Sequence, residues 1–158
     1  MSAEELYIRM AEYDDIDDIL KITADAFINY QKLSGASKLD ALEEEYDTVK
    51  RDIDTKLVFA AVLGNEVAGC VRVKIFPDKC AYLTRFAVKT DIQNKGIGKA
   101  LMSAVDDAMI ENSVKEISLH TGAEIASLMN FYTQLGFSTK SVESSRGYKR
   151  ALLVKKYL

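Results

Sequence analysis

The sequence lacks the features that mark membrane, secreted and repeat proteins. No apolar run approaches the roughly 20 residues of a membrane-spanning helix. The acidic segment MSAEELYIRMAEYDDIDD has no basic region followed by an apolar stretch, so it does not resemble a secretory signal. No repeat, low-complexity segment or linker divides the 158 residues. We therefore expect a cytoplasmic protein with a single domain over residues 1–158 and no membrane partner.

Cysteine and histidine are scarce. The chain has two cysteines, Cys70 and Cys80, and one histidine, His120. Both cysteines lie in apolar, strand-like segments without metal-ligand spacing around them. We interpret them as reduced packing residues rather than as a disulfide, and we predict no metal site.

Charge is unevenly distributed along the chain, although the net charge is only −3. Residues 1–54 hold 15 acidic and 6 basic side chains, a net charge of −9, whereas residues 55–158 hold 9 acidic and 15 basic ones, a net charge of +6. The basic second half favours an anionic ligand there. Lys and Arg form no run or helical stripe, so we expect no nucleic-acid partner.

Apolar periodicity predicts an α/β (α+β-like) domain. The expected strands cover residues 6–11, 57–63, 67–76, 80–88, 115–121, 137–143 and 148–158. The expected helices cover residues 40–54, 96–112 and 124–136, and a first helix follows Asp14 or Asp15 and includes Phe27. Hairpin-length turns between residues 57 and 88 predict an antiparallel meander, and the later crossovers imply a parallel pair. The sheet should therefore be mixed, mostly antiparallel and covered by helices on both faces.

A glycine-containing turn, 93-QNKGIGK-99, opens the helix expected at residues 96–112. A helix N-terminus carries unsatisfied N–H groups and partial positive charge, so it can bind an anion. Gly96 and Gly98 allow a ligand to approach the backbone closely. Further donors or positive charges come from Gln93, Asn94, Lys95 and Lys99. Neither GxGxxG nor GxxxxGK[ST] is present, so the turn either binds a phosphate or only connects strand to helix.

Two motifs resemble those of the GNAT superfamily, the acyl-CoA-dependent N-acyltransferases. The turn 93-QNKGIG-98 resembles the Q/R-x-x-G-x-G/A loop of that family, and it follows the apolar strand 82-YLTRFAV-88. The segment 131-FYTQLGF-137 is similar to the second signature, an aromatic–tyrosine pair on a helix that closes with Gly-Phe into a strand. The resemblance covers residues 57–137 and implies a GNAT-like sheet with a splayed central strand pair.

The resemblance also implies acetyl-CoA as the acyl donor, with no metal. The CoA pyrophosphate suits the backbone N–H groups of residues 93–99. In the family the pantetheine arm pairs with the backbone of the strand before the loop, which needs no particular side chains. The cofactor-binding residues implied in this way are Phe86, Ala87, Val88, Gln93, Asn94, Lys95, Gly96, Ile97, Gly98 and Lys99.

The implied reaction is the transfer of an acyl group from a thioester to an amine. A tyrosine commonly protonates the departing thiolate in the family, and Tyr132 matches its position. Many relatives carry a glutamate base where Tyr82 stands here, with Thr84 two residues further along the same face. His120 could relay a proton or be structural, and Glu124 could be a base or only favour the helix dipole. Deprotonation of the amine through ordered water is the remaining interpretation.

Residues 27–45, 72–84 and 138–150 are expected to select the acceptor amine. An acidic wall in the first segment would suit a cationic amine such as a polyamine, an aminoglycoside or a lysine side chain. Its residues are Glu43, Glu44, Glu45 and Asp47. Arg72 and Arg85 lie on strands that flank the site, and an inward-pointing arginine could bind a substrate carboxylate. The acceptor, a small molecule or a peptide, therefore stays open.

Two other classes of function also stay open. Because the strand glutamate is missing, the protein could be a non-catalytic acyl-CoA-binding sensor or partner domain. A nucleotide could replace CoA as the phosphate ligand. A homodimer could form through the C-terminal strand, which we expect to be exposed, although nothing in the sequence requires one.

Overall fold

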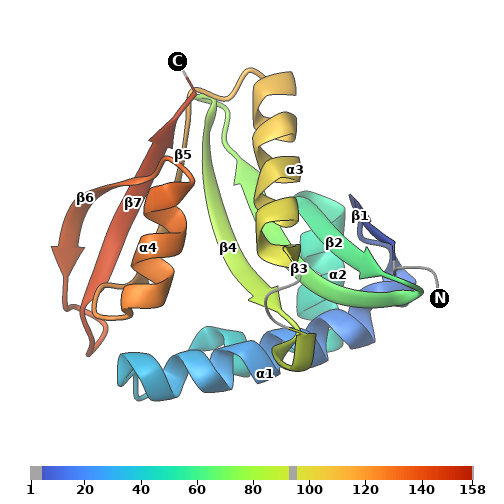
Figure 1. The fold of residues 1–158 in the computed structure, drawn as a ribbon, viewed down its shortest axis with the longest axis horizontal. Coiled ribbons are helices and arrows are strands. Elements are labelled where there is room, and N and C mark those ends of the chain that lie inside the picture. Colours follow the sequence, from blue (N-terminus) through green and yellow to red (C-terminus); the bar gives the residue numbers. More distant parts are fainter. Residues whose placement is uncertain (1–4, 93–95, 158) are drawn as a thin grey trace.

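Seven strands form one mixed sheet in the order β1-β2-β3-β4-β5-β7-β6 (Figure 1). The computed structural model describes residues 5–92 and 96–157. The strands are β1 (Leu6–Met10), β2 (Leu57–Leu63), β3 (Glu66–Ile75), β4 (Cys80–Val88), β5 (Glu116–Gly122), β6 (Ser138–Glu143) and β7 (Arg150–Lys156). Only the pair β4–β5 is parallel, and all other neighbours are antiparallel. The expected mixed, mostly antiparallel sheet is confirmed.

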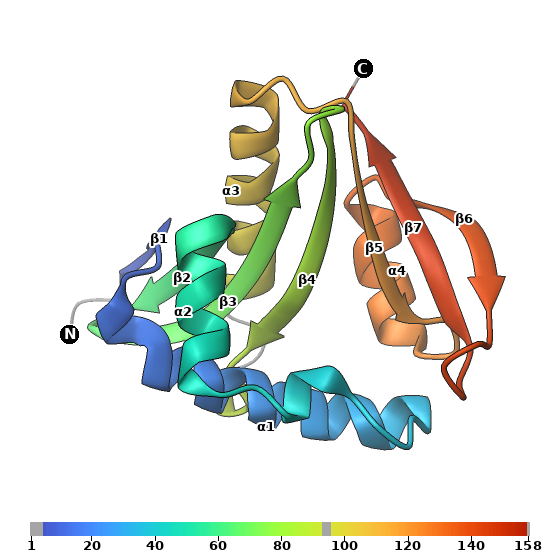
Figure 2. The ribbon, with the colours of Figure 1, turned by 180° about the vertical axis from the view of Figure 1, so that it is seen from behind.

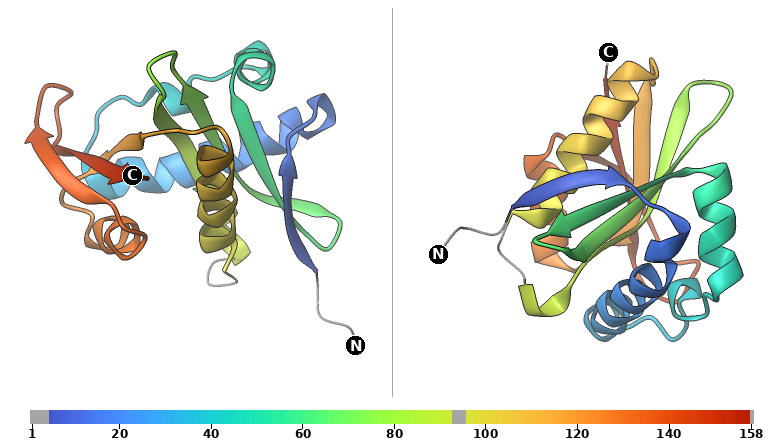
Figure 3. Two further views of the ribbon diagram at one scale, coloured as in Figure 1. Left: turned by 90° about the horizontal axis from the view of Figure 1, so that it is seen from above. Right: turned by 90° about the vertical axis from the view of Figure 1, so that its right-hand side faces the viewer.

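Helices cover both faces of this sheet, as expected (Figure 3). One face carries α1 (Ile16–Ser34) and α2 (Tyr46–Thr55), and the other carries α3 (Ile97–Glu111) and α4 (Ala126–Gln134). Short 3-10 turns are η1 (Tyr13–Asp15), η2 (Asp40–Leu42) and η3 (Thr90–Ile92). Among the described residues, no helix has the length and apolarity needed to cross a membrane.

The second helix begins later than the sequence predicted. Residues 40–42 form a 3-10 turn, and α2 starts only at Tyr46. The reason is local, because Glu45 and Thr48 form a reciprocal capping box that defines the helix start. The acidic residues before it therefore belong to a connection, which runs past one end of the sheet.

The core has two parts, one on each face of the sheet. Beneath α3 and α4 lie buried side chains that include Val71, Leu101, Val105, Ile117 and Leu153. Beneath α1 and α2 lie Ile16, Ile19, Val58, Ala60 and Cys70. Both cysteines are free thiols, Cys70 buried and Cys80 half-buried, in agreement with the expected packing role.

The parallel pair β4–β5 separates after a short ladder. Only three pairs join the strands, and the last is Tyr82↔Ser118. Beyond it the strands diverge (Figure 2). A bulge between β3 and β4 lies at the same level, where Arg85 has a φ of 56°. An extra residue bends its strand and disturbs the ladder, so β4 turns away from β5. The expected splayed central pair is confirmed.

The C-terminal strand is not exposed at an edge, which corrects our prediction. β7 pairs with β5 on one side and with β6 on the other. The hairpin of β6 and β7 inserts its second strand into the sheet, so β6 becomes the edge. A second subunit therefore cannot pair with β7, because both edges of this strand are already paired within the chain.

Candidate active site

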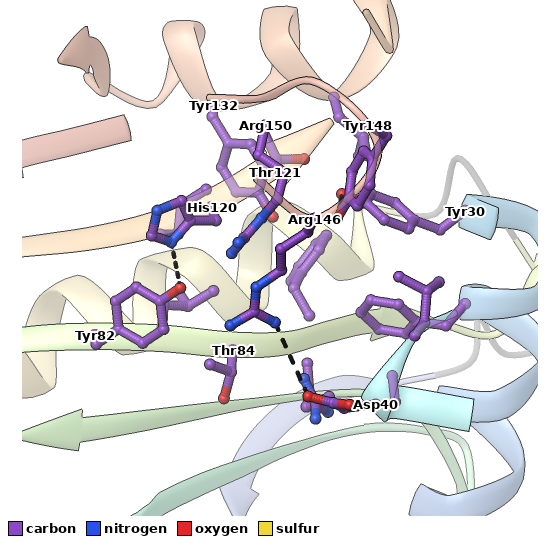
Figure 4. A pocket seen from close by; sticks show the side chains of 18 of the residues that line it. Tyr30, Asp40, Tyr82, Thr84, His120, Thr121, Tyr132, Arg146, Tyr148 and Arg150 are labelled. Carbon is purple, nitrogen blue, oxygen red and sulfur yellow. Dashed lines mark hydrogen bonds and ion pairs between the residues drawn. The ribbon is translucent and has the colours of Figure 1, made fainter. Parts of the chain in front are cut away.

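A cavity of about 170 Å³ lies where β4 and β5 separate (Figure 4). We call it the acceptor pocket. Its walls come from the C-terminal half of β4, the end of β5, α1, α4 and the segment that joins β6 to β7. The sequence-predicted residues that line it are Tyr82, Thr84, Arg85, Phe86, His120 and Tyr132. The splay therefore brings together side chains that lie up to 50 positions apart in the chain.

Tyr82 and His120 face each other across the gap (Figure 4). The Tyr82 hydroxyl lies 2.5 Å from His120 Nδ1, so the two groups are hydrogen-bonded. Burial, reinforced by the positive charge of Arg150, lowers the pKa of His120 below its ordinary value of 6.5. Burial also raises the pKa of Tyr82. At neutral pH the imidazole is therefore neutral and can accept the tyrosine O–H at Nδ1.

The titration of His120 provides a direct check, because it is the only histidine of the chain. We expect its NMR titration to give a pKa below 6.5, since burial and the charges of Arg150 and Arg146 outweigh the opposing charge of Glu143. Arg150→Gln should move the pKa upward, whereas Arg51→Gln, an exposed site on α2, should not. A wild-type pKa above 6.5 would contradict this arrangement.

Tyr132 projects from α4 into the apolar part of the pocket. Its ring packs against those of Phe86, Phe131 and Phe137, with centroids 5.2 to 6.1 Å away. The side chain is buried, and within the described residues its hydroxyl makes no hydrogen bond. Burial raises the pKa of Tyr132, so the phenol stays protonated at neutral pH. An unpartnered phenolic proton at the wall of a cavity is available to a ligand atom.

A second cavity of about 220 Å³ adjoins the acceptor pocket and shares four lining residues with it, Phe27, Tyr30, Phe86 and Leu128. It runs beside Ala87, Val88 and Thr90, between the end of β4 and α1. The β5 ladder ends before this stretch, so alternate backbone groups of residues 83–87 face the gap. The two cavities together form a long cleft along β4.

The two glycines of the turn have different environments. Gly96 is the N-cap of α3 with a φ of 74°, and among the residues that the structure describes no atom would lie within 4 Å of a Cβ there. A Cβ on Gly98 would lie 3.0 Å from the Phe86 ring, so Gly98 lets α3 pack closely against the pocket wall. Ile97 is buried in the core, whereas Lys99 is exposed. Gln93, Asn94 and Lys95 lie outside the described residues.

Two predicted residues do not reach the pocket. Glu124 is exposed and precedes α4, which begins only at Ala126. Arg72 is completely buried and points to the α2 face of the sheet, where it pairs with Glu44 and Asp52. Their placement leaves neither side chain in contact with the cavity.

The acidic wall also lies elsewhere. Glu44 bridges the buried Arg72 and the pocket residue Arg85, while Glu45 caps α2. Among the residues lining the acceptor pocket, Asp40 is the only acidic one. The residues that could have formed an acidic wall therefore do not line the pocket, and cations outnumber carboxylates in its lining.

Several pocket residues were not singled out by the sequence. Tyr30 of α1 and Tyr148 meet across the pocket, with hydroxyl oxygens 3.0 Å apart. Arg146 and Arg150 enter from the segment 146-RGYKR-150. Residues 138–150 had been expected to select the acceptor, but their individual roles had no motif to mark them. A basic, aromatic cluster beside a strand was the only available signal.

Comparison with known families and structures agrees with this geometry. The model of the acetyltransferase (GNAT) family matches residues 17–137. The chain therefore belongs to the GNAT family, as the two motifs indicated. The donor of this family is acetyl-CoA.

Individual relatives are distant in sequence. The uncharacterized protein YyaT of Bacillus subtilis is 28% identical over 135 residues, which cover 85% of this chain and 84% of that protein. The uncharacterized N-acetyltransferase CT2212 of Chlorobaculum tepidum is 26% identical over 107 residues, or 62% of this chain and 69% of that protein. The similarity extends beyond the two motifs.

The fold agrees closely with solved acetyltransferases. The PaiA N-acetyltransferase of Thermoplasma acidophilum, in complex with coenzyme A, superposes with a TM-score of 0.81 at 20% identity, over 97% of this chain and 99% of that one. YncA of Salmonella typhimurium, a putative acetyltransferase with its cofactor acetyl-CoA, gives 0.80 at 16% identity, over 96% and 94%. These superpositions confirm the arrangement of sheet and helices.

Proposed function

We propose that this protein transfers an acetyl group from acetyl-CoA to a primary amine by direct attack. The observation that carries the proposal is the cleft along the splayed strand β4. It runs from Thr90, just beyond the end of β4, to the protonated hydroxyl of Tyr132 and the Tyr82–His120 pair. Membership of the GNAT family supports the same reaction.

The residues at the cofactor end fit CoA. The N-terminus of α3 offers backbone N–H groups and partial positive charge to the pyrophosphate. With respect to the described residues, Gly96 leaves space on its Cβ side for a bulky anion. The backbone of Phe86 and Ala87 can bind the amide-bearing pantetheine arm by strand addition. When bound, acetyl-CoA supplies an activated thioester.

The proton steps fall to three side chains of the acceptor pocket. An acceptor ammonium must lose a proton before it can attack. Tyr82 can accept that proton while its own hydroxyl proton passes to Nδ1 of His120, which is neutral at pH 7. Tyr132 holds a proton at its phenolic oxygen and donates it to the departing thiolate. This path uses no carboxylate base, which accounts for the missing strand glutamate.

Calorimetric titration of the protein with acetyl-CoA, CoA and ATP tests the cofactor assignment. We expect micromolar Kd values for both CoA species and weaker binding of ATP. Gly96→Val should raise the Kd of acetyl-CoA by about tenfold or more, because the side chain enters the space assigned to the pyrophosphate.

Gly35→Val is the matched control for this substitution. Gly35 has a φ of 78°, and a Cβ there would also have no atom within 4 Å. Both variants should lose roughly 1–2 kcal/mol of stability from backbone strain, but only Gly96→Val should lose affinity. Equal Kd values in the two variants, or tighter binding of ATP than of CoA, would contradict the assignment.

A screen of amines for the release of free thiol then separates an enzyme from a sensor. An acetyltransferase releases CoA only when an acceptor is present. A non-catalytic acyl-CoA-binding domain would bind acetyl-CoA with the same affinity and release none.

A further inference from the structure

The acceptor pocket carries an excess of positive charge. Its ionised lining residues are Lys38, Asp40, Arg85, Arg146 and Arg150. His120 is neutral at pH 7, so the lining itself holds four cations and one carboxylate. Glu43, Glu44 and Glu143 contact three of these cations from outside the lining. Positive charge in a half-closed cavity favours anionic groups and disfavours additional cations. A polyamine or an aminoglycoside would bring several ammonium groups into this field.

Arg85 is held by Glu44, but the two arginines of the segment 146–150 are only weakly paired with carboxylates of the described residues. Arg150 Nη1 lies 3.4 Å from Glu143 Oε1, and Arg146 Nη1 lies 3.9 Å from Asp40 Oδ2. An arginine has five N–H donors. Each of these contacts is long and involves one nitrogen, so most of the donors have no partner among the described residues.

Two other arginines of the chain each form a bidentate pair with a carboxylate and serve as a comparison. Arg9 binds Asp15 with two contacts, of 2.7 and 3.0 Å. Arg72 binds Glu44 with two contacts, of 2.6 and 2.8 Å. Such forked geometry is typical of arginine with a carboxylate that matches it. The pocket arginines lack a carboxylate of this kind among the described residues.

The positions of these arginines relate them to the reacting amine. Arg150 of β7 lies opposite Gly122, two residues beyond His120 on β5. The positive charges of Arg150 and Arg146 both act to lower the pKa of His120 and of Tyr82. Figure 4 shows Arg146 reaching across the pocket toward Asp40, beside Thr84. An anionic group held by these arginines would lie a short distance from the Tyr82 hydroxyl.

We infer that the acceptor is a small amine that also carries a carboxylate, and that Arg150 and Arg146 bind this carboxylate. The inference rests on the proposed acetyl transfer and adds the class of its acceptor. A volume of about 170 Å³ lies below the roughly 300–1,000 Å³ of pockets for drug-sized ligands, which favours a molecule of amino-acid size. The aromatic rings of Tyr30 and Tyr148 supply an apolar wall for its remaining atoms.

Matched acceptors test the inference. Each standard amino acid is compared with its carboxamide and with its decarboxylated amine, and free thiol is measured in the presence of acetyl-CoA. We expect kcat/KM for the best amino acid to exceed the values for its carboxamide and its decarboxylated amine by about tenfold or more. The reason is that these two compounds cannot make the charge-assisted bidentate contact of a carboxylate. Spermidine serves as the polycationic comparison and should be poorer than this amino acid.

Variants assign the effect to the arginines. Arg150→Gln should raise KM for the amino acid by about 10- to 100-fold and leave the Kd of acetyl-CoA unchanged, with a smaller loss for Arg150→Lys. For the decarboxylated amine, Arg150→Gln should leave KM unchanged or lower it. Arg51→Gln, which removes a charge from the exposed face of α2, should change none of these constants.

The outcomes distinguish this inference from the proposed function. Turnover of decarboxylated amines or spermidine at rates equal to those of amino acids would overturn the carboxylate assignment but retain acetyl transfer. Binding of acetyl-CoA without turnover of any amino acid would overturn it as well. Failure of acetyl-CoA to bind would overturn both.

Discussion

Replacing Tyr132 with phenylalanine should lower kcat by about 10²- to 10⁴-fold, the usual contribution of a general acid. The substitution removes only the hydroxyl, whose atom makes no hydrogen bond within the described residues. The ring contacts with Phe86, Phe131 and Phe137 are retained. The Kd of acetyl-CoA should therefore stay within about a factor of two, a difference of under 1 kcal/mol.

The raised pKa of Tyr132 is compatible with this role. A phenol that holds its proton tightly is a weak acid, so protonation of a thiolate in water would be unfavourable. Burial acts on both groups, however, and the pKa of a thiol also rises in apolar surroundings. In the proposed reaction the thiolate would leave into the same ring-lined end of the pocket. Proton transfer from Tyr132 would then occur between two desolvated groups of raised pKa.

Tyr157→Phe is the matched control for the loss of a tyrosine hydroxyl. Tyr157 donates to Asp106, 2.6 Å away, and does not line the acceptor pocket. Its replacement should lower stability slightly and leave kcat unchanged. A Tyr132→Phe enzyme with wild-type kcat would assign the proton to another donor. Loss of acetyl-CoA binding in the same variant would show that the hydroxyl supports the cleft instead.

The elements with strong local signals could be predicted from the sequence. The meander of β2, β3 and β4 follows from apolar runs separated by two short turns, and it forms as expected. The order of β6 and β7 could not be predicted in the same way. Periodicity identifies both strands of a hairpin, but it does not say which strand enters the sheet.

The bulge at Arg85 had no sequence signal. A φ of 56° in a strand is usually marked by glycine, and the segment 82-YLTRFAV-88 contains none. Such strain in a non-glycine residue is maintained by its surroundings, here including the contact of Arg85 with Glu44. A tertiary contact over 41 positions cannot be inferred from local spacing.

The cofactor side of the site was easier to predict than the acceptor side. Tyr132 and the turn at residues 93–99 belong to motifs with fixed local spacing. The pocket arginines come instead from separate segments that meet only in the folded chain. Arg72 was considered for the pocket because it lies on a strand expected to flank the site, but β3 is buried on both faces, and the side chain lies on the α2 face. A strand whose apolar residues occupy both faces does not reveal which face a charged residue within it occupies.

The buried position of Arg72 has a large energetic consequence. Its side chain is 0% exposed and contacts Glu44 and Asp52, whose side chains are 4% and 14% exposed. Removing one member of a buried ion cluster leaves the others desolvated without compensation, at a cost of about 3–5 kcal/mol. Arg72 Nε has no hydrogen-bond partner among the described residues, which already costs roughly 1–3 kcal/mol in the wild type.

Arg72→Met should therefore lower the free energy of unfolding by about 3 kcal/mol, near the lower end of the range for a broken buried pair. Two features reduce the loss: the unpartnered Nε disappears, and Glu44 keeps its 3.3 Å contact with Arg85. Urea unfolding followed by circular dichroism measures the change. Arg9→Met is the control, because the Arg9 side chain is 33% exposed, and its loss should cost about 1 kcal/mol.

A double variant shows whether the loss comes from the uncompensated carboxylate. Glu44→Gln in the Arg72→Met background removes that charge, so the double variant should have a larger free energy of unfolding than Arg72→Met alone. Because Glu44 also contacts Arg85, the double variant should still impair the acceptor pocket. Equal losses for Arg72→Met and Arg9→Met would show that water reaches the cluster. A further loss in the double variant would mean that Glu44 stabilises the fold through Arg85 rather than through Arg72.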